Sequence, residues 1–82
     1  GKVSVMEAIE DGDICAVSKT WEGNTIYVLM NLNETEQKII SVPKDSYNYK
    51  ELCGYYSVDG SKVKLAKDGT LTLPPYSIAV LK

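Results

Sequence analysis

Short apolar segments separated by turn signals are the feature that most constrains the fold of this chain. Segments rich in Val, Ile, Leu, Tyr and Thr recur along the sequence, and Gly, Pro, Asn and Asp interrupt them at intervals of roughly 8–12 residues. No stretch carries the apolar periodicity of a helix of about ten residues or more. The pattern predicts an all-β fold, an antiparallel Greek-key β-sandwich of about seven or eight short strands.

The central strand is predicted over residues 24–33, where apolar residues occupy alternate positions. Residues 13–19 form a preceding strand, and residues 20–24 supply the turn of a hairpin. Two sets of side chains point to opposite faces of the central strand. The set that we expect to lie in the core is Ile26, Val28, Met30 and Leu32.

The remaining segments continue the pattern. A polar turn at residues 33–36 leads to a strand over residues 37–42, which Pro43 ends because proline has no N–H for a ladder. The further expectations are a strand over residues 3–9, a loop over 46–54 leading into a short strand, turns at 58–61 and 67–69 each followed by a short strand, and a last strand over 76–81. The last strand is apolar on both faces, which indicates a buried position rather than a sheet edge.

Two consecutive prolines, Pro74 and Pro75, interrupt the last apolar stretch. Neither can join a ladder in the middle of a sheet. We therefore expect them to mark the crossing between a strand that ends at Leu73 and the last strand, with Tyr76 packing over the corner.

Composition limits the chain to one small soluble domain over residues 1–82. Nine basic and eleven acidic residues give a net charge of −2, and the lysines are scattered, so we expect no nucleic-acid partner. The longest apolar run, residues 26–30, is far shorter than the roughly 20 residues of a membrane helix, so we expect no membrane partner. Because the sequence begins Gly1-Lys2 without methionine, we expect it to be either a piece of a larger protein or a mature product, and its compartment stays open.

The cysteines allow a single disulfide without requiring it. Cys15 lies in an apolar strand, where a free cysteine usually acts as a small buried hydrophobe, and we favour that interpretation over pairing with Cys53. A thiol nucleophile is excluded because the chain contains no histidine to activate it.

The triplet Asp11-Gly12-Asp13 is similar to the start of a calcium loop, but the remaining ligands are missing. We expect no metal and no cofactor.

Three segments in this order resemble one protein family. Residues 12–19 (GDICAVSK), 25–33 (TIYVLMNLN) and 71–81 (LTLPPYSIAVL) look like the C-terminal β-sandwich of the alpha-amylase family of glycoside hydrolases. The resemblance covers residues 12–82. The chain departs from the family pattern at Lys19, where arginine is common, and at Leu32-Asn33, where Phe-Ser is common.

The resemblance implies a domain that follows a catalytic (β/α)₈ barrel in the full-length enzyme. In the family the catalytic carboxylates lie on that barrel, so no catalytic residue is carried over to this chain. The expected function is that of a non-catalytic accessory domain that stabilises the barrel of a parent enzyme acting on α-glucans such as starch. Two alternatives stay open: a carbohydrate-binding module for α-glucan, and an immunoglobulin-like protein-interaction module.

The acidic residues fall mostly in turn-like segments, where carboxylates are usually solvated. We expect any pocket to be shallow and to lack converging carboxylates, unlike a glycosidase cleft. Aromatic side chains are the remaining candidates for sugar binding, since a sugar ring stacks on an exposed aromatic face. We favour the alternative that they cap the sandwich or pack on the barrel, which would leave some of them exposed in the isolated domain. The weak candidates are Trp21, Tyr47, Tyr49, Tyr55 and Tyr56.

Overall fold

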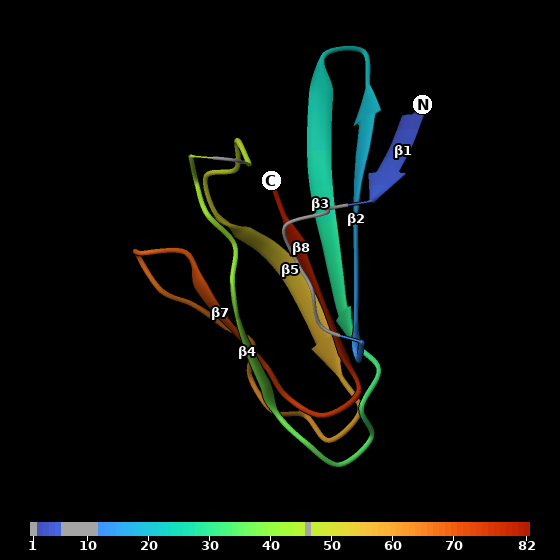
Figure 1. Ribbon diagram of the computed structural model, residues 1–82. Helices are drawn as coiled ribbons and strands as arrows, with labels where there is room; N and C mark the ends of the chain where they lie inside the picture. Colours follow the sequence, from blue (N-terminus) through green and yellow to red (C-terminus); the bar gives the residue numbers. More distant parts are fainter. Residues whose placement is uncertain (1, 6–11, 46) are drawn as a thin grey trace.

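The computed structural model describes residues 2–5, 12–45 and 47–82, which form eight antiparallel strands in two sheets (Figure 1). The all-β sandwich is therefore confirmed. Within these ranges no helix is long and apolar enough to cross a membrane. The strands are β1 (Lys2–Val5), β2 (Ile14–Trp21), β3 (Asn24–Asn31), β4 (Lys38–Ser41), β5 (Leu52–Ser57), β6 (Lys64–Leu65), β7 (Thr70–Leu73) and β8 (Ser77–Leu81).

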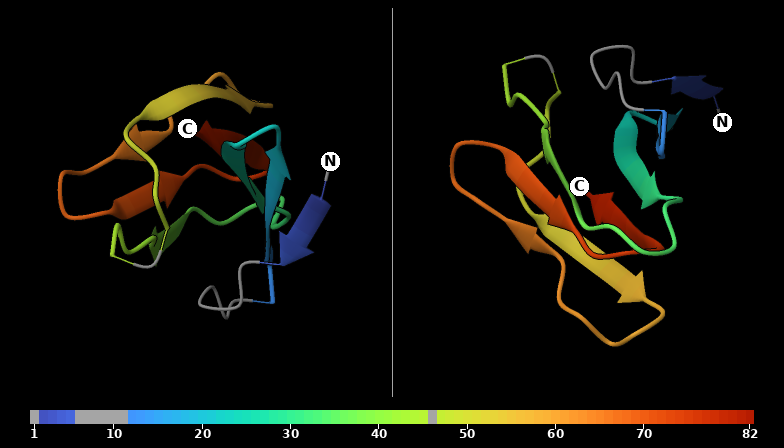
Figure 2. Two further views of the ribbon diagram at one scale, coloured as in Figure 1. Left: turned by 90° about the horizontal axis from the view of Figure 1, so that it is seen from above. Right: turned by 60° about the horizontal axis from the view of Figure 1, so that its bottom comes forward.

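The chain passes repeatedly between the two sheets, as the views in Figure 2 show. The larger sheet has the order β1-β2-β3-β8-β5, and the smaller sheet has the order β4-β7-β6. The chain changes sheet after β3, after β4, after β5 and after β7. As a result β8 lies between β3 and β5, with a neighbour on each side, so the prediction of a buried last strand is confirmed.

The β2–β3 hairpin turns more tightly than the sequence pattern predicts. Trp21 pairs with Asn24, so only Glu22 and Gly23 form the loop. Both have positive φ, 44° and 81°, as a type I′ turn requires. The strands extend further than expected because this turn matches their right-handed twist and lets the ladder continue to the tip.

The core lies between the sheets and is made of alternate residues from both. Leu29, Leu71, Leu73 and Leu81 are completely buried in it. Among the described residues, the buried apolar side chains are Ile14, Ala16, Tyr27, Leu29, Val42, Tyr49, Val63, Leu71, Leu73, Ala79 and Leu81.

The facing of the central strand is the reverse of our expectation. Leu29 is fully buried and Asn31 is 1% exposed, whereas Met30 lies on the outer face of the sheet and is only half-buried. Leu32 follows the end of β3 and is 52% exposed. Alternation identifies the residues that share a face, but β3 is apolar on both faces, so alternation alone does not say which face is inward. The polar Asn31 also made the true inner face look like the solvent face.

The outer face of the five-stranded sheet is apolar as well. Val5, Val17, Val28 and Val80 lie in one continuous row across β1, β2, β3 and β8. Within the described residues the second sheet packs against the opposite, inner face, so this row remains partly exposed to solvent. The larger sheet therefore presents apolar side chains in two directions.

The proline corner carries the chain between the sheets as predicted. β7 ends at Leu73 in the smaller sheet, and β8 begins at Ser77 in the larger sheet. The amide nitrogen of Asn31 donates to the carbonyls of Leu73 and Pro74, at 3.2 and 3.0 Å, and to that of Glu36 at 2.9 Å. One side chain on β3 thus binds both the corner and the connection that leads to β4.

The two least regular segments are described in part. β1 covers residues 2–5 and so includes residues 3–5 of the predicted first strand, whereas residues 6–9 lie outside the described residues. The predicted loop over 46–54 leads into β5, which begins at Leu52, and Ser46 also lies outside the described residues.

The two faces of β3 predict opposite responses to a carboxylate. Leu29→Asp should unfold the domain because the charge would enter the sealed core. Met30→Asp should leave the domain folded, with a loss of roughly 1–2 kcal/mol, because its side chain can reach water from the outer face. Urea denaturation of both variants checks the assignment, and a folded Leu29→Asp variant beside an unfolded Met30→Asp variant would show that the facing is wrong.

Candidate functional site

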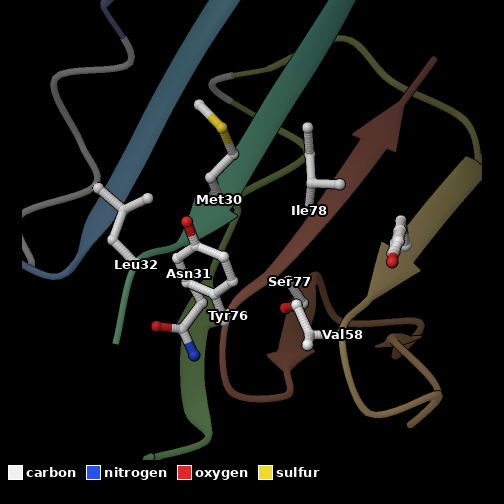
Figure 3. Close-up of a pocket in the computed structure, with 8 residues that line it drawn as sticks. Met30, Asn31, Leu32, Val58, Tyr76, Ser77 and Ile78 are labelled. Atoms are coloured by element: carbon white, nitrogen blue, oxygen red, sulfur yellow. The ribbon is translucent and has the colours of Figure 1, made fainter. Parts of the chain in front are cut away.

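A mostly apolar pocket lies beside the proline corner (Figure 3). Its volume is about 390 Å³. The described residues that line it include no carboxylate and no lysine. They are Met30, Asn31, Leu32, Tyr56, Val58, Tyr76, Ser77 and Ile78.

Strand register and the neighbouring connections together build this pocket. Met30 on β3 is directly opposite Ile78 on β8, and Ile78 is opposite Tyr56 on β5, so the three side chains form a row across the outer face. Three further side chains come from the segments next to these strands. The exposed members are Leu32 at 52%, Tyr56 at 59%, Val58 at 64% and Tyr76 at 51%.

Tyr76 has a backbone conformation that is uncommon for a tyrosine. Its φ is +48°, in the left-handed region that costs a residue with a side chain roughly 1–2 kcal/mol relative to glycine. The Tyr76 amide donates to the carbonyl of Asn33 at 2.8 Å, which fixes the turn. The strained backbone places a half-exposed phenol ring at the edge of the pocket.

The polar groups beneath the pocket are occupied within the fold. Asn31 donates through its amide nitrogen to the corner carbonyls, and its side-chain oxygen accepts from the Asn33 amide at 2.9 Å. The Ser77 hydroxyl donates to the Pro74 carbonyl at 2.7 Å. These groups serve the corner and have little capacity left for a ligand.

A second pocket, of about 270 Å³, adjoins the first and is acidic. It shares Val58 and Tyr76 with the apolar pocket, and its other described lining residues are Glu34, Asp59 and Pro75. Hydrogen bonding from the Ser61 backbone amide holds the pKa of Asp59 below its usual value of 3.8. Asp59 is therefore ionised at neutral pH and offers a negative contact rather than a proton donor.

Asp13 lies at the same end of the domain and forms an ion pair with Lys38. Its carboxylate lies 3.0 Å from the Lys38 ammonium and accepts a hydrogen bond from the side-chain amide of Asn33. Two hydrogen bonds lower the pKa of Asp13, with the larger effect from Lys38 and the smaller from Asn33. Asp11, the other acid of the calcium-like triplet, lies outside the described residues. Among the described residues no three His, Cys, Asp or Glu side chains gather into a metal-binding group.

Two of the weak sugar-binding candidates pack into the opposite end of the sandwich. Tyr49 is 4% exposed, and its hydroxyl donates to the Val42 carbonyl. Burial, followed by the charge of Asp68, raises the pKa of Tyr49 above 10.0. Tyr47 is half-buried and meets Tyr27 edge-on, with ring centroids 5.5 Å apart. The buried Tyr49 leaves no open ring face for a sugar.

The other three weak candidates are exposed but do not form one site. Trp21 is 36% exposed at the tip of the β2–β3 hairpin, and Tyr55 is 46% exposed on β5 opposite Ala79. Tyr56 is the one weak candidate that lines the apolar pocket. Trp21 is far from Tyr56. Cys15 on β2 lies in the same cross-strand row as Tyr56, and Trp21 lies six residues further along β2, which corresponds to about 20 Å.

Sequence reasoning missed most of the residues that line the apolar pocket, namely Met30, Leu32, Val58, Tyr76 and Ile78. A usable signal was present in β3 and β8, which are apolar on both faces. A domain of this size has two layers, so only one face of each strand can enter the core. The second apolar face therefore indicates an outer surface that some further element can cover.

The cysteines are free and widely separated. Cys15 on β2 and Cys53 on β5 have β3 and β8 between them. Three strand spacings of about 4.8 Å separate them by roughly 14 Å across the sheet alone, which is already beyond the reach of a disulfide. In the folded chain Cys15 and Cys53 therefore do not form the disulfide that the sequence had left open.

Comparison of the sequence with models of known protein families gives no match, and comparison with curated proteins gives none either.

The close contact of Gly69 with Val42 and Tyr49 predicts that Gly69 cannot be replaced by a larger residue without loss of stability. A Cβ on Gly69, where φ is 92°, would lie 2.6 Å from the Val42 carbonyl oxygen and 3.1 Å from the Tyr49 hydroxyl. Gly69→Ala should therefore displace this hydrogen bond in addition to straining the backbone, and should cost about 2–4 kcal/mol.

Gly60→Ala is the matched control for Gly69→Ala. Gly60 has a similar φ of 80°, but nothing lies within 4 Å of its added Cβ. This variant should lose only the backbone cost of about 1–2 kcal/mol. Urea denaturation compares the two variants, and equal midpoints would contradict the packing described around Gly69.

Proposed function

We propose that this chain is a non-catalytic accessory domain of an alpha-amylase-type glycoside hydrolase, which stabilises the catalytic (β/α)₈ barrel of the same parent chain. The observation that carries the proposal is the exposed apolar surface around the pocket, which we call the corner patch. The corner patch consists of Met30, Leu32, Tyr56, Val58, Tyr76 and Ile78.

The exposure of the corner patch argues for a covering partner. Four of its side chains are more than half exposed, and they converge on one pocket rather than being scattered singly. Contiguous apolar patches of this kind usually mark a contact with another protein surface. The half-buried row of Val17, Val28 and Val80 extends the apolar area along the same sheet. An interdomain interface of roughly 600–1,500 Å² would cover such a surface.

The resemblance of residues 12–82 to the family's C-terminal sandwich supplies the identity of the partner.

The carboxylate chemistry is consistent with a non-catalytic role. Hydrogen bonding from Thr70 lowers the pKa of Asp68, as the contacts described above do for Asp13 and Asp59. A glycosidase acid needs the opposite shift, toward a protonated carboxyl group at neutral pH.

A carbohydrate-binding module for α-glucan is the second candidate. The observation that favours it is the pairing of Tyr56 and Tyr76, whose exposed rings line one pocket. Exposed aromatic rings can stack on sugar faces. The neighbouring Met30, Leu32 and Ile78 offer no hydrogen bonds to sugar hydroxyls, and this favours the interdomain role.

The first test of the accessory-domain role is the coding sequence upstream of Gly1, which should encode a (β/α)₈ barrel. With that barrel expressed as a separate polypeptide, the domain should bind it in isothermal titration calorimetry. The double substitution Tyr56→Ser/Val58→Ser should weaken binding about tenfold or more, because buried aromatic contacts dominate interface energy.

Ile39→Ser provides the matched control. Ile39 is 63% exposed on β4, in the opposite sheet, and should tolerate the change without loss of affinity. Absence of an upstream barrel would refute the proposal. Binding of maltoheptaose to the isolated domain, lost on Tyr56→Ser, would instead support the carbohydrate-binding module.

A further inference from the structure

We propose that the partner surface on the corner patch presents a lysine or arginine beside a large apolar side chain. The apolar side chain enters the pocket at Met30 and Ile78, and the cation lies between Glu34 and Asp59. This inference rests on the proposed function, because it specifies the surface chemistry of the barrel that covers the patch.

The continuity of the two pockets is the first support. Val58 and Tyr76 line both of them, so the apolar pocket and the acidic pocket form one surface with a shared wall. A ligand group that fills the first pocket therefore lies next to the second. The surface selects for an occupant with adjacent apolar and charged groups.

The charge of the acidic pocket is the second support. Glu34 and Asp59 are both exposed carboxylates, and the lowered pKa of Asp59 keeps it ionised near neutral pH. Among the described residues that line either pocket there is no lysine. A cation from a partner would complement this charge, whereas an acidic partner would be repelled.

The identity of residue 76 is the third support. Glycine or asparagine would adopt the positive φ of this position at lower cost than tyrosine. The phenol ring is half-exposed and therefore adds little to the core. It lines both pockets, and the face of a tyrosine ring can receive a cation.

The polar groups of the surface disfavour a sugar as the occupant. The amide of Asn31 and the hydroxyl of Ser77 are bound to corner carbonyls, so they have little left to offer to sugar hydroxyls. The apolar pocket would also leave hydroxyl groups unpaired against methyl groups. A basic and apolar protein segment suits both halves better.

The experiment uses the parent protein with a protease site inserted before Gly1. After cleavage, analytical ultracentrifugation measures the dissociation constant of the domain from the barrel over a range of NaCl concentrations. Glu34→Gln/Asp59→Asn should weaken association by roughly threefold to thirtyfold at low salt and should reduce its salt dependence. Glu22→Gln/Glu51→Gln, at the opposite end of the sandwich, is the charge-matched control and should bind as the parent does.

A second pair of variants tests Tyr76 without the risk of unfolding. Tyr76→Gly relieves the positive φ and should leave the domain at least as stable in urea, yet it should weaken association about tenfold. Glu22→Gly gives the same backbone relief at φ 44°, away from the patch, and should not change association.

The outcomes separate the two proposals. If the parent domain stays bound and Glu34→Gln/Asp59→Asn binds equally well at every salt concentration, the inference fails and the proposed function stands. If the parent domain leaves the barrel at every salt concentration, the proposed function fails and the inference fails with it. Displacement of the cleaved domain by maltoheptaose would assign the surface to sugar and would also overturn the inference.

Discussion

The fold depends on one buried amide. Asn31 ends the central strand with 1% of its surface exposed, and its nitrogen donates to carbonyls at the proline corner and on the way to β4. Its oxygen accepts from the Asn33 amide and so orients the turn after β3. Because the corner carbonyls of Leu73 and Pro74 belong to the β7–β8 crossing, this side chain joins the two sheets where the chain passes between them. A buried polar group of this kind stabilises only when its partners are in place, so it also specifies a single arrangement of the corner.

The corner in turn positions the candidate site. The turn that Asn31 holds carries Asn33, whose carbonyl accepts from the Tyr76 amide. Tyr76 therefore stands at the junction of the apolar and acidic pockets because of hydrogen bonds within the fold. The inner face of the sheet supplies the core, and the outer face supplies the surface that we assign to the partner.

The sequence correctly predicted the two-sheet architecture, but it did not predict which face of β3 is buried. Strand alternation, the hairpin around Glu22-Gly23 and the crossing at Pro74-Pro75 follow from local chemistry, and local chemistry is readable in sequence. The inward direction of Leu29 rather than Met30 depends on tertiary contacts, namely the packing of Leu29 in the core and the hydrogen bonds of Asn31 to carbonyls 42 and 43 residues away along the chain. The pocket was missed for the same reason, since it joins segments that only the topology brings together.

Asn31→Asp tests the central role of the amide most directly, because it keeps the shape of the side chain and removes both donor hydrogens. A carboxylate would then face the carbonyl oxygens of Leu73 and Pro74. We predict that urea denaturation at pH 7 shows a loss of about 3 kcal/mol or more, partly recovered in acid as the carboxyl group takes up a proton. Asn48→Asp, at an exposed position, is the matched control and should cost less than about 0.5 kcal/mol. Equal midpoints for the two variants at pH 7 would contradict the account.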